Sequence, residues 1–182
     1  MTENLTSRDL ANIAARAIDE KKGSDIVIQE VGELLNVTDY FIIATGANRR
    51  RVDAIQEYVE ECLTKEAGIK PYSIEGLDEM TWVLMDYGNI VVHIFQPAQR
   101  DFYRLEQLWE DAPTMDAAAA GIEDAEYSER ISKLLEHQKQ RMEELAAEGS
   151  QEEESESDVE EYDEIIDPEG TGFTREEFDE LK

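Results

Sequence analysis

The sequence Tyr40-Phe41-Ile42-Ile43-Ala44-Thr45 decides the fold class of this chain. It is a continuous apolar run, without the alternation of apolar and polar residues that a half-exposed strand shows. Such a run predicts a central strand that is covered on both faces. Gly46 ends the run, and Asn48 can cap a following helix over about residues 49–67. The buried stripe of that helix is predicted to consist of Val52, Ile55, Val59, Cys62 and Leu63.

Segments on both sides of this run predict the rest of the fold. The predicted elements, in chain order, are a helix at 7–22, strands at 25–31 and 40–45, a helix at 49–67, strands at 71–74, 81–86 and 90–95, and a helix at 100–110. A tight hairpin through residues 87–89 joins the last two strands. This order predicts a mixed β-sheet with helices packed on it, in the α/β (α+β mixed) class.

The distribution of charge divides the chain at Pro113. Residues 1–112 hold 11 Lys and Arg against 21 Asp and Glu, a net charge of −10, and residues 113–182 hold 6 against 24, a net charge of −18. The first region also holds nearly all the β-branched runs. We therefore predict one domain over residues 1–112 and an acidic C-terminal extension over residues 113–182. Because the extension has few core-type residues, a cut after Ala112 is expected to leave the melting temperature unchanged.

The acidic extension has three parts. Residues 127–147 predict a helix with approximate coiled-coil spacing. Residues 148–164 are almost all Glu, Asp and Ser, a composition that favours disorder. Residues 173–181 predict a short amphipathic segment that becomes ordered on contact with a partner.

The net charge of −28 limits the classes of partner. A chain this acidic is repelled by free DNA and by anionic membranes, because phosphate binding needs a basic face. A basic protein partner is favoured instead. The local exception is Arg49-Arg50-Arg51. These arginines are either solvated side chains without a function or a basic site for RNA or for an acidic neighbour.

The sequence also favours a cytoplasmic location. The single cysteine, Cys62, excludes an internal disulfide, and the first residues lack the pattern of a signal peptide. No apolar run approaches the roughly 20 residues of a membrane-spanning helix.

Motifs of catalysis and metal binding are absent from the sequence. It contains no Cys-x-x-Cys pair, no His-Glu-x-x-His helix and no glycine-rich phosphate loop. His93 lies inside an apolar strand, where a histidine with a satisfied hydrogen bond is more common than a catalytic base. We therefore expect a protein that is not an enzyme and that needs no cofactor or metal.

One predicted strand carries a mixed surface pattern. In residues 81–86, Trp82, Leu84 and Asp86 share a face, whereas Val83 and Met85 point to the other side. An aromatic, an aliphatic and an acidic side chain on one face suit an interface with a basic partner. The alternative is that Trp82 is simply a core residue.

Residues from about Leu5 to Pro113 resemble the ribosomal silencing factors, also called Iojap-like proteins. The segments that carry the resemblance are Asp25-Ile26-Val27, Thr38 to Gly46, the Glu75-Gly76 turn, Trp82 to Gly88, Val91 to Phe95, Phe102 to Glu106 and Leu108-Trp109. The resemblance implies binding to protein L-fourteen of the large ribosomal subunit, which blocks joining of the small subunit and lowers translation under nutrient limitation. Members in organelles help to assemble the large subunit, and many members are dimers.

The resemblance also implies a nucleotidyltransferase-like fold and a site. Nucleotidyltransferases use a Gly-Ser pair and two metal-binding carboxylates, but here Gly46 precedes Ala47 and the carboxylate pair is missing, so we interpret the fold as inherited and the chemistry as lost. By resemblance, the partner-binding residues would be Trp82, Val83 and Leu84 for apolar contact, Asp78, Glu79 and Asp86 for basic partner residues, and Tyr87 and Tyr103. An assembly factor without silencing activity fits the same residues.

Overall fold

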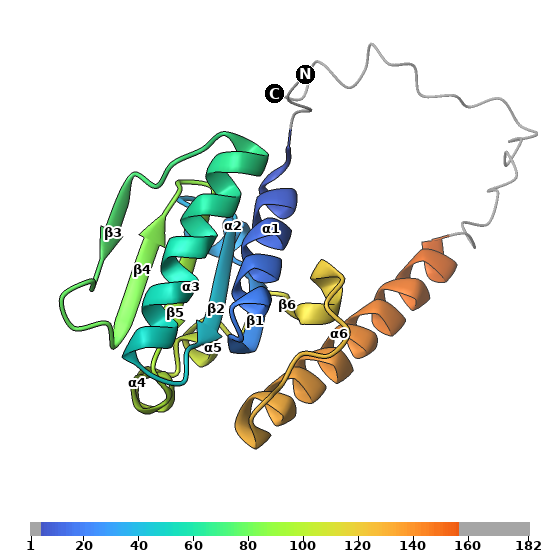
Figure 1. Cartoon of the computed structure of the whole chain (residues 1–182). Coiled ribbons are helices and arrows are strands. Elements are labelled where there is room, and N and C mark those ends of the chain that lie inside the picture. The colour runs from blue at the N-terminus through green and yellow to red at the C-terminus, as the bar shows by residue number, and fades with distance from the viewer. Residues whose placement is uncertain (1–4, 157–182) are drawn as a thin grey trace, which may run out of the picture. The chain divides into compact units, whose positions relative to one another are not determined.

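A computed structural model describes residues 5–156 of the chain, and side chains within residues 5–148. The fold is built on one six-stranded mixed sheet with the strand order β3-β4-β5-β2-β1-β6 (Figure 1). The strands are β1 (Ser24–Glu30), β2 (Tyr40–Thr45), β3 (Ser73–Glu75), β4 (Trp82–Asp86), β5 (Ile90–Phe95) and β6 (Thr114–Asp116). The helices are α1 (Ser7–Glu20), α2 (Gly32–Leu35), α3 (Arg49–Cys62), η1 (Leu63–Ala67), α4 (Pro97–Tyr103), α5 (Leu105–Leu108), η2 (Ala117–Ala120) and α6 (Glu129–Glu156).

The apolar run at residues 40–45 forms β2, in the interior of the sheet. It pairs in parallel with β5 and antiparallel with β1. Ile42 belongs to the core on one side of the sheet, whereas Phe41 and Ile43 belong to a second cluster on the other side. The prediction of a central strand covered on both faces is confirmed, and so is the mixed α/β class.

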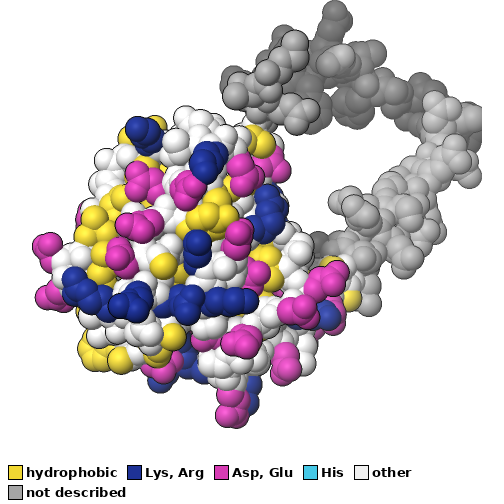
Figure 2. Space-filling view, viewed as in Figure 1, with side chains coloured by type: hydrophobic (Ala, Val, Ile, Leu, Met, Phe, Trp, Pro, Cys, Tyr) yellow, Lys and Arg dark blue, Asp and Glu magenta, His cyan; other side chains and the backbone are white. Residues whose placement is uncertain are grey.

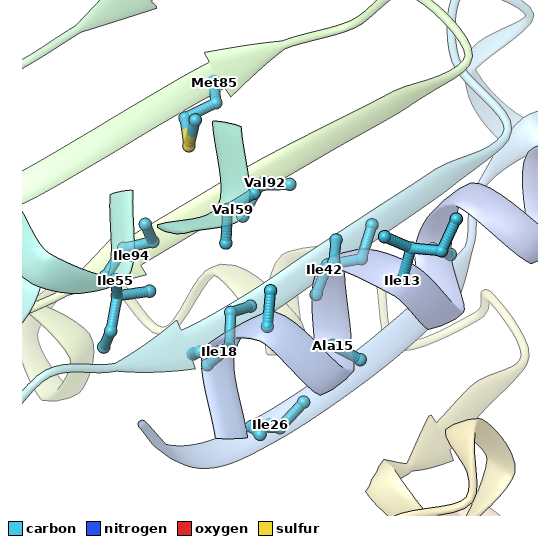
Figure 3. Packing of buried hydrophobic residues seen from close by; sticks show 14 of the residues in the cluster. Ile13, Ala15, Ile18, Ile26, Ile42, Ile55, Val59, Met85, Val92 and Ile94 are labelled. Carbon is cyan, nitrogen blue, oxygen red and sulfur yellow. The ribbon is translucent and has the colours of Figure 1, made fainter. Parts of the chain in front are cut away.

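Helices α1 and α3 cover one face of the sheet (Figure 1). Both helices have an N-terminal cap, because the free N–H groups of the first turn need acceptors. Thr6 caps α1 in a capping box with Asp9, and Asn48 Oδ1 accepts from Arg51 N at 3.0 Å at the start of α3. The outer sides of the two helices carry mixed charges (Figure 2). Their inner sides point at the sheet: Ile18 and Ile55 lie over Ile42 and Ile94 in the main core (Figure 3).

The other face of the sheet is covered only in part, by α4 and α5. A single helix over residues 100–110 was expected, but Arg104 adopts a left-handed conformation (φ 47°) that separates the two helices. The break has a physical reason. Six residues do not complete whole turns of a helix with 3.6 residues per turn, so a continuous helix would point Arg100 and Glu106 in different directions. The turn at Arg104 instead brings them together as a buried ion pair.

The sheet continues past Pro113, beyond the domain boundary predicted after Ala112. Strand β6 pairs antiparallel with β1, and η2 contributes buried alanines to the main core. Ile122 and Ile131 are also buried. The described residues up to Leu145 form one compact unit, and a second unit begins at Ala146. The change in composition at Pro113 does not mark the end of the fold. A strand of three residues adds too few apolar residues to be noticed in a segment that is rich in Asp and Glu.

The predicted helix at 127–147 corresponds to α6, which begins at Glu129 and continues to Glu156, so the prediction of disorder is wrong for residues 148–156. The rest of the stretch predicted to be disordered, and the amphipathic segment at 173–181, lie outside the described residues. In the described part of the chain, no helix combines the length and hydropathy required to cross a membrane.

Candidate functional site

An aromatic cluster lies on the sheet face that α1 and α3 leave open. Trp82 is at its centre: its ring stacks on Phe95 with 4.8 Å between centroids and lies 4.8 Å from Tyr103. His93 contacts Phe41 edge to face at 4.9 Å, and Phe41 in turn meets Trp109. We call this set, Phe41, Trp82, His93, Phe95, Tyr103 and Trp109, the aromatic face.

A hydrogen bond fixes the orientation of Trp82. Its indole Nε1–H donates to His93 Nδ1 at 3.2 Å, so the proton of the neutral imidazole is on Nε2. Nε2 is buried and has no hydrogen-bond partner among the described residues. Burial, with a smaller contribution from the charge of Arg100, lowers the pKa of His93 to about 3. His93 is therefore uncharged at neutral pH and remains an acceptor for Trp82.

The depressed pKa predicts a loss of stability in acid that depends on His93. Its unfolded value is 6.5, so the unfolded chain binds the proton first, and stability present above pH 6.5 is lost as the pH falls toward 3. Between pH 6.5 and 5.5 this group alone should reduce the free energy of unfolding by about 1 kcal/mol.

Urea unfolding at both pH values, on the wild type and on His93→Gln, measures this contribution. Gln offers an acceptor to Trp82 but does not titrate, so the variant should lose about 1 kcal/mol less over this interval. Equal losses in the two proteins would contradict an uncharged, buried His93.

Strand alternation sorts the predicted partner-binding residues. Trp82, Leu84 and Asp86 are half-buried on the open face, as their spacing predicts. Val83 is fully buried against the main core, because it alternates with Trp82. Tyr87 is also buried, at 6% exposure, since the hairpin turns its ring into the same core, and burial raises the pKa of its hydroxyl. The expectation that Val83 and Tyr87 contact a partner is corrected: neither side chain reaches the surface.

The acidic residues occupy different positions around the aromatic face. Asp78 and Glu79 are exposed and line a hollow of about 530 Å³ next to Trp82, together with Gly76, Thr81, Gln99 and Tyr103. Asp86 accepts a hydrogen bond from Gly88 N at 2.7 Å, so one of its carboxylate oxygens holds the hairpin turn. Asp78 and Glu79 are therefore the acids that are available to basic groups of a partner.

Backbone contacts hold the loop that carries these acids. Gln96 Nε2 donates to Met80 O at 2.9 Å, and Arg49 Nη1 donates to Glu79 O at 3.2 Å. Gly76 has a positive φ of 88°, and a Cβ atom there would lie 1.9 Å from Trp82 O. Glycine is therefore required where this loop approaches β4.

Exposed apolar side chains extend the aromatic face along α4 and α5. The exposed fraction is 79% for Phe102, 71% for Leu108 and 51% for Tyr103, so most of the surface of these apolar side chains is in contact with water. The rings of Phe102 and Tyr103 touch edge to face at 5.0 Å, and adjoining exposed apolar side chains of this kind are typical of a site of interaction with another molecule. Residues Phe102 and Leu108 were not predicted, because their spacing in the sequence fits a helix packed on the sheet.

A buried charged network supports α4 and α5, and sequence reasoning missed it. Arg100 Nε donates to Glu106 Oε2 at 3.1 Å, and its other nitrogens donate to Thr45 Oγ1 and Asp25 O. Both side chains are almost completely buried. Burial lowers the pKa of Arg100, while Glu106 opposes the change. The sequence does not predict this ion pair, because the two residues meet only through the left-handed turn at Arg104, and no residue pattern indicates that turn.

The start of α6 completes this network. Arg130 pairs with the second oxygen of Glu106 and, at 2.9 Å, with Asp101 Oδ1. Further along the helix, Gln138 Nε2 donates to Glu110 O at 2.8 Å. The first turns of α6 therefore pack on the segment that carries Phe102 and Tyr103.

The three arginines lie at the start of α3, where Arg49 and Arg50 are exposed and Arg51 is half-buried. They lie at the end of the sheet where the C-terminus of β2 is found. In the described part of the chain, no group of three or more His, Cys, Asp or Glu side chains could hold a metal ion.

Comparisons with known proteins agree with this fold. A family model described as "Ribosomal silencing factor during starvation" matches residues 4–160. The ribosomal silencing factor RsfS of Bacillus subtilis is 38% identical over 112 residues, which are 62% of this chain and 94% of the relative. A crystal structure of a Chromobacterium violaceum protein, 36% identical, superposes with a TM-score of 0.55 over 58% of this chain and 87% of that one.

A relative with a different name is the mouse "Mitochondrial assembly of ribosomal large subunit protein 1". It is 33% identical over 92 residues, which are 50% of this chain and 40% of that protein.

Proposed function

Because the chain belongs to the family of ribosomal silencing factors, we propose that it binds the large ribosomal subunit and blocks joining of the small subunit. Translation would then fall when nutrients are limiting, as the description of the family indicates. The partner on the subunit would be protein L-fourteen, which the resemblance of the sequence implies. The protein would act in the cytoplasm, and a homodimer is an additional part of this proposal.

One observation carries the proposal: the fixed, half-exposed Trp82 at the centre of the aromatic face. Large aromatic side chains with restricted rotamers are common anchors of protein interfaces, because little conformational entropy is lost on binding. Tyr103 and Leu84 provide apolar contact beside it. Asp78 and Glu79 at the rim favour basic residues of a partner, as expected for a protein of the ribosome.

We propose a binding protein without catalytic activity. The only histidine of the aromatic face is enclosed and holds Trp82, so it is not placed to transfer a proton to a substrate. The family model and the Bacillus subtilis relative are named as silencing factors. With nucleoside triphosphates and magnesium, no nucleotidyl transfer is expected.

An assembly factor for the large subunit is the second candidate, and the name of the mouse relative supports it. The same aromatic face could bind a large subunit before it is complete. The two candidates differ in when the protein is present: a silencing factor binds mature subunits, whereas an assembly factor binds precursors.

The main test is the joining of purified ribosomal subunits. Added to mature large subunits before small subunits, the protein should keep most of the subunits from joining, so that they sediment separately on a sucrose gradient. The expected cause is occupation of the surface where the two subunits meet. The reverse order of addition is the control, because joined ribosomes already cover that surface.

The result would separate the candidates. Binding to mature large subunits without any effect on joining would reject silencing and favour assembly, in which case loss of the protein should cause large-subunit precursors to accumulate. No binding to mature or precursor subunits would contradict both.

A further inference from the structure

A row of basic side chains crosses the face of α1 and α3 near one end of the sheet (Figure 2). The end of α1 and the start of α3 are neighbours in the fold, because Arg51 Nη1 donates to Lys21 O at 3.0 Å. We call Lys22, Arg49, Arg50 and Arg51 the basic belt. Lys21 is not part of it, because its Nζ lies over the ring of Tyr58 at 4.3 Å.

The basic belt has no acidic partners, although acids are in large excess. The chain has 45 Asp and Glu against 17 Lys and Arg. Within the described residues, none of the four belt side chains forms an ion pair. The four positive charges of the belt are therefore not neutralised by a described acidic residue.

Two of the belt residues are held in place by backbone carbonyls. Arg49 donates to Glu79 O at 3.2 Å, and Arg51 donates to Lys21 O at 3.0 Å. Lys22 and Arg50 make no hydrogen bond through their side chains in the part of the chain that is described. Three consecutive arginines in the first turn of α3, without an acidic residue in that turn, repel one another and the positive helix end. This arrangement lowers stability slightly, and a bound anion would offset that cost.

One end of the basic belt, Arg49, reaches the rim of the aromatic face. The contact is Arg49 to Glu79, and Glu79 lines the hollow beside Trp82. A partner protein on the aromatic face would thus bring the belt against whatever surrounds that protein. On a ribosomal subunit the surroundings are rich in RNA phosphate.

We propose that the basic belt binds phosphates of ribosomal RNA next to the protein that occupies the aromatic face. This inference rests on the proposed function, since it needs the large subunit as partner. Guanidinium groups match phosphate oxygens in two-pronged hydrogen bonds, and Lys22 adds a point charge. The belt also orients the chain: with a net charge of −28, any other side turned toward RNA would be repelled.

The test is the salt dependence of binding to purified large ribosomal subunits. The double variant Lys22→Gln/Arg50→Gln removes the two belt charges that hold no other group, so its fold should be unchanged. The matched control is Lys70→Gln/Lys139→Gln, which removes two exposed charges away from the belt. Each phosphate contact contributes about 1 to the slope of log affinity against log salt.

The belt variant should therefore show a slope smaller by about 2 and a loss of at least roughly 10-fold in affinity at low salt. The control should keep the wild-type slope. A belt variant with the wild-type slope would overturn this inference. If the wild type itself does not bind large subunits at any salt concentration, the proposed function fails instead.

A second measurement identifies the class of molecule that the belt contacts. A photo-crosslinking amino acid at position 50 is irradiated with the protein bound to large subunits, and the products are digested with ribonuclease. Adducts that ribonuclease shortens are expected. Crosslinks to ribosomal protein alone would show that an acidic protein surface is the partner, and would overturn the assignment to RNA.

Discussion

Replacing Trp82 by alanine is expected to weaken binding to large ribosomal subunits by about 30-fold or more, which corresponds to about 2 kcal/mol. The side chain is half-buried, stacks on Phe95 and donates to His93, so it presents a fixed apolar surface to a partner. Its removal takes away contact area and one of the ring contacts of the neighbouring Tyr103. Equilibrium binding of labelled protein to subunits measures the loss.

Two further variants separate binding from folding. Trp82→Phe keeps stacking on Phe95 but cannot donate to His93, so its affinity should lie between those of the wild type and the alanine variant. Tyr72→Ala is the matched control, because Tyr72 is an aromatic residue that is 81% exposed and lies outside the aromatic face. A Trp82→Ala protein that binds like the wild type would reject the aromatic face as the docking site. A collapse of its melting temperature would show that Trp82 acts mainly in the core.

The sequence predicts most of the sheet because local signals agree with the fold there. The apolar run of β2, the cap at Asn48 and the hairpin at Gly88 each rest on interactions within a few residues. Such features depend on backbone hydrogen bonds and on alternation of side chains, which are visible in any window of sequence.

The errors arise where distant residues decide the structure. The left-handed turn at Arg104 is stabilised by the buried pair of Arg100 and Glu106, which no local pattern indicates. Strand β6 forms because β1 offers it a partner edge, although its own sequence of three residues carries no strand pattern.

The candidate site was predicted from strand alternation and from the resemblance to a family, and the two gave different results. Strand alternation placed Trp82 and Val83 on opposite sides of the sheet, and the structure agrees. The resemblance to a family added Val83 to the partner-binding set, and there the structure disagrees. A resemblance transfers a segment as a whole, whereas burial distinguishes adjacent residues within it. The sequence identifies His93 as a strand residue. Its role in orienting Trp82 is visible only in the structure, where the two side chains form a hydrogen bond.

The acidic extension is now expected to be necessary for stability, contrary to the expectation from composition. Cutting the chain after Ala112 removes β6, η2 and the whole of α6. The loss includes the buried side chains of Ile122 and Ile131, each of which stabilises the fold by about 2 kcal/mol. It also removes Tyr127, whose hydroxyl donates to Ile26 O at 2.9 Å and accepts from Ala117 N at 2.7 Å. The buried Glu106 would lose Arg130, one of its two partners.

Together these losses should lower the free energy of unfolding by at least about 4 kcal/mol and the melting temperature by roughly 10 °C or more. Thermal unfolding followed by circular dichroism measures the change. A cut after Glu156 is the control, because it leaves β6, η2 and α6 in place, and its melting temperature should equal that of the full chain. Arg130→Gln should lose part of the stability, whereas Lys133→Gln, one turn further on an exposed side of α6, should lose little. An unchanged melting temperature after the cut at Ala112 would mean that β6 and α6 do not stabilise the sheet, and that the domain ends where the composition changes.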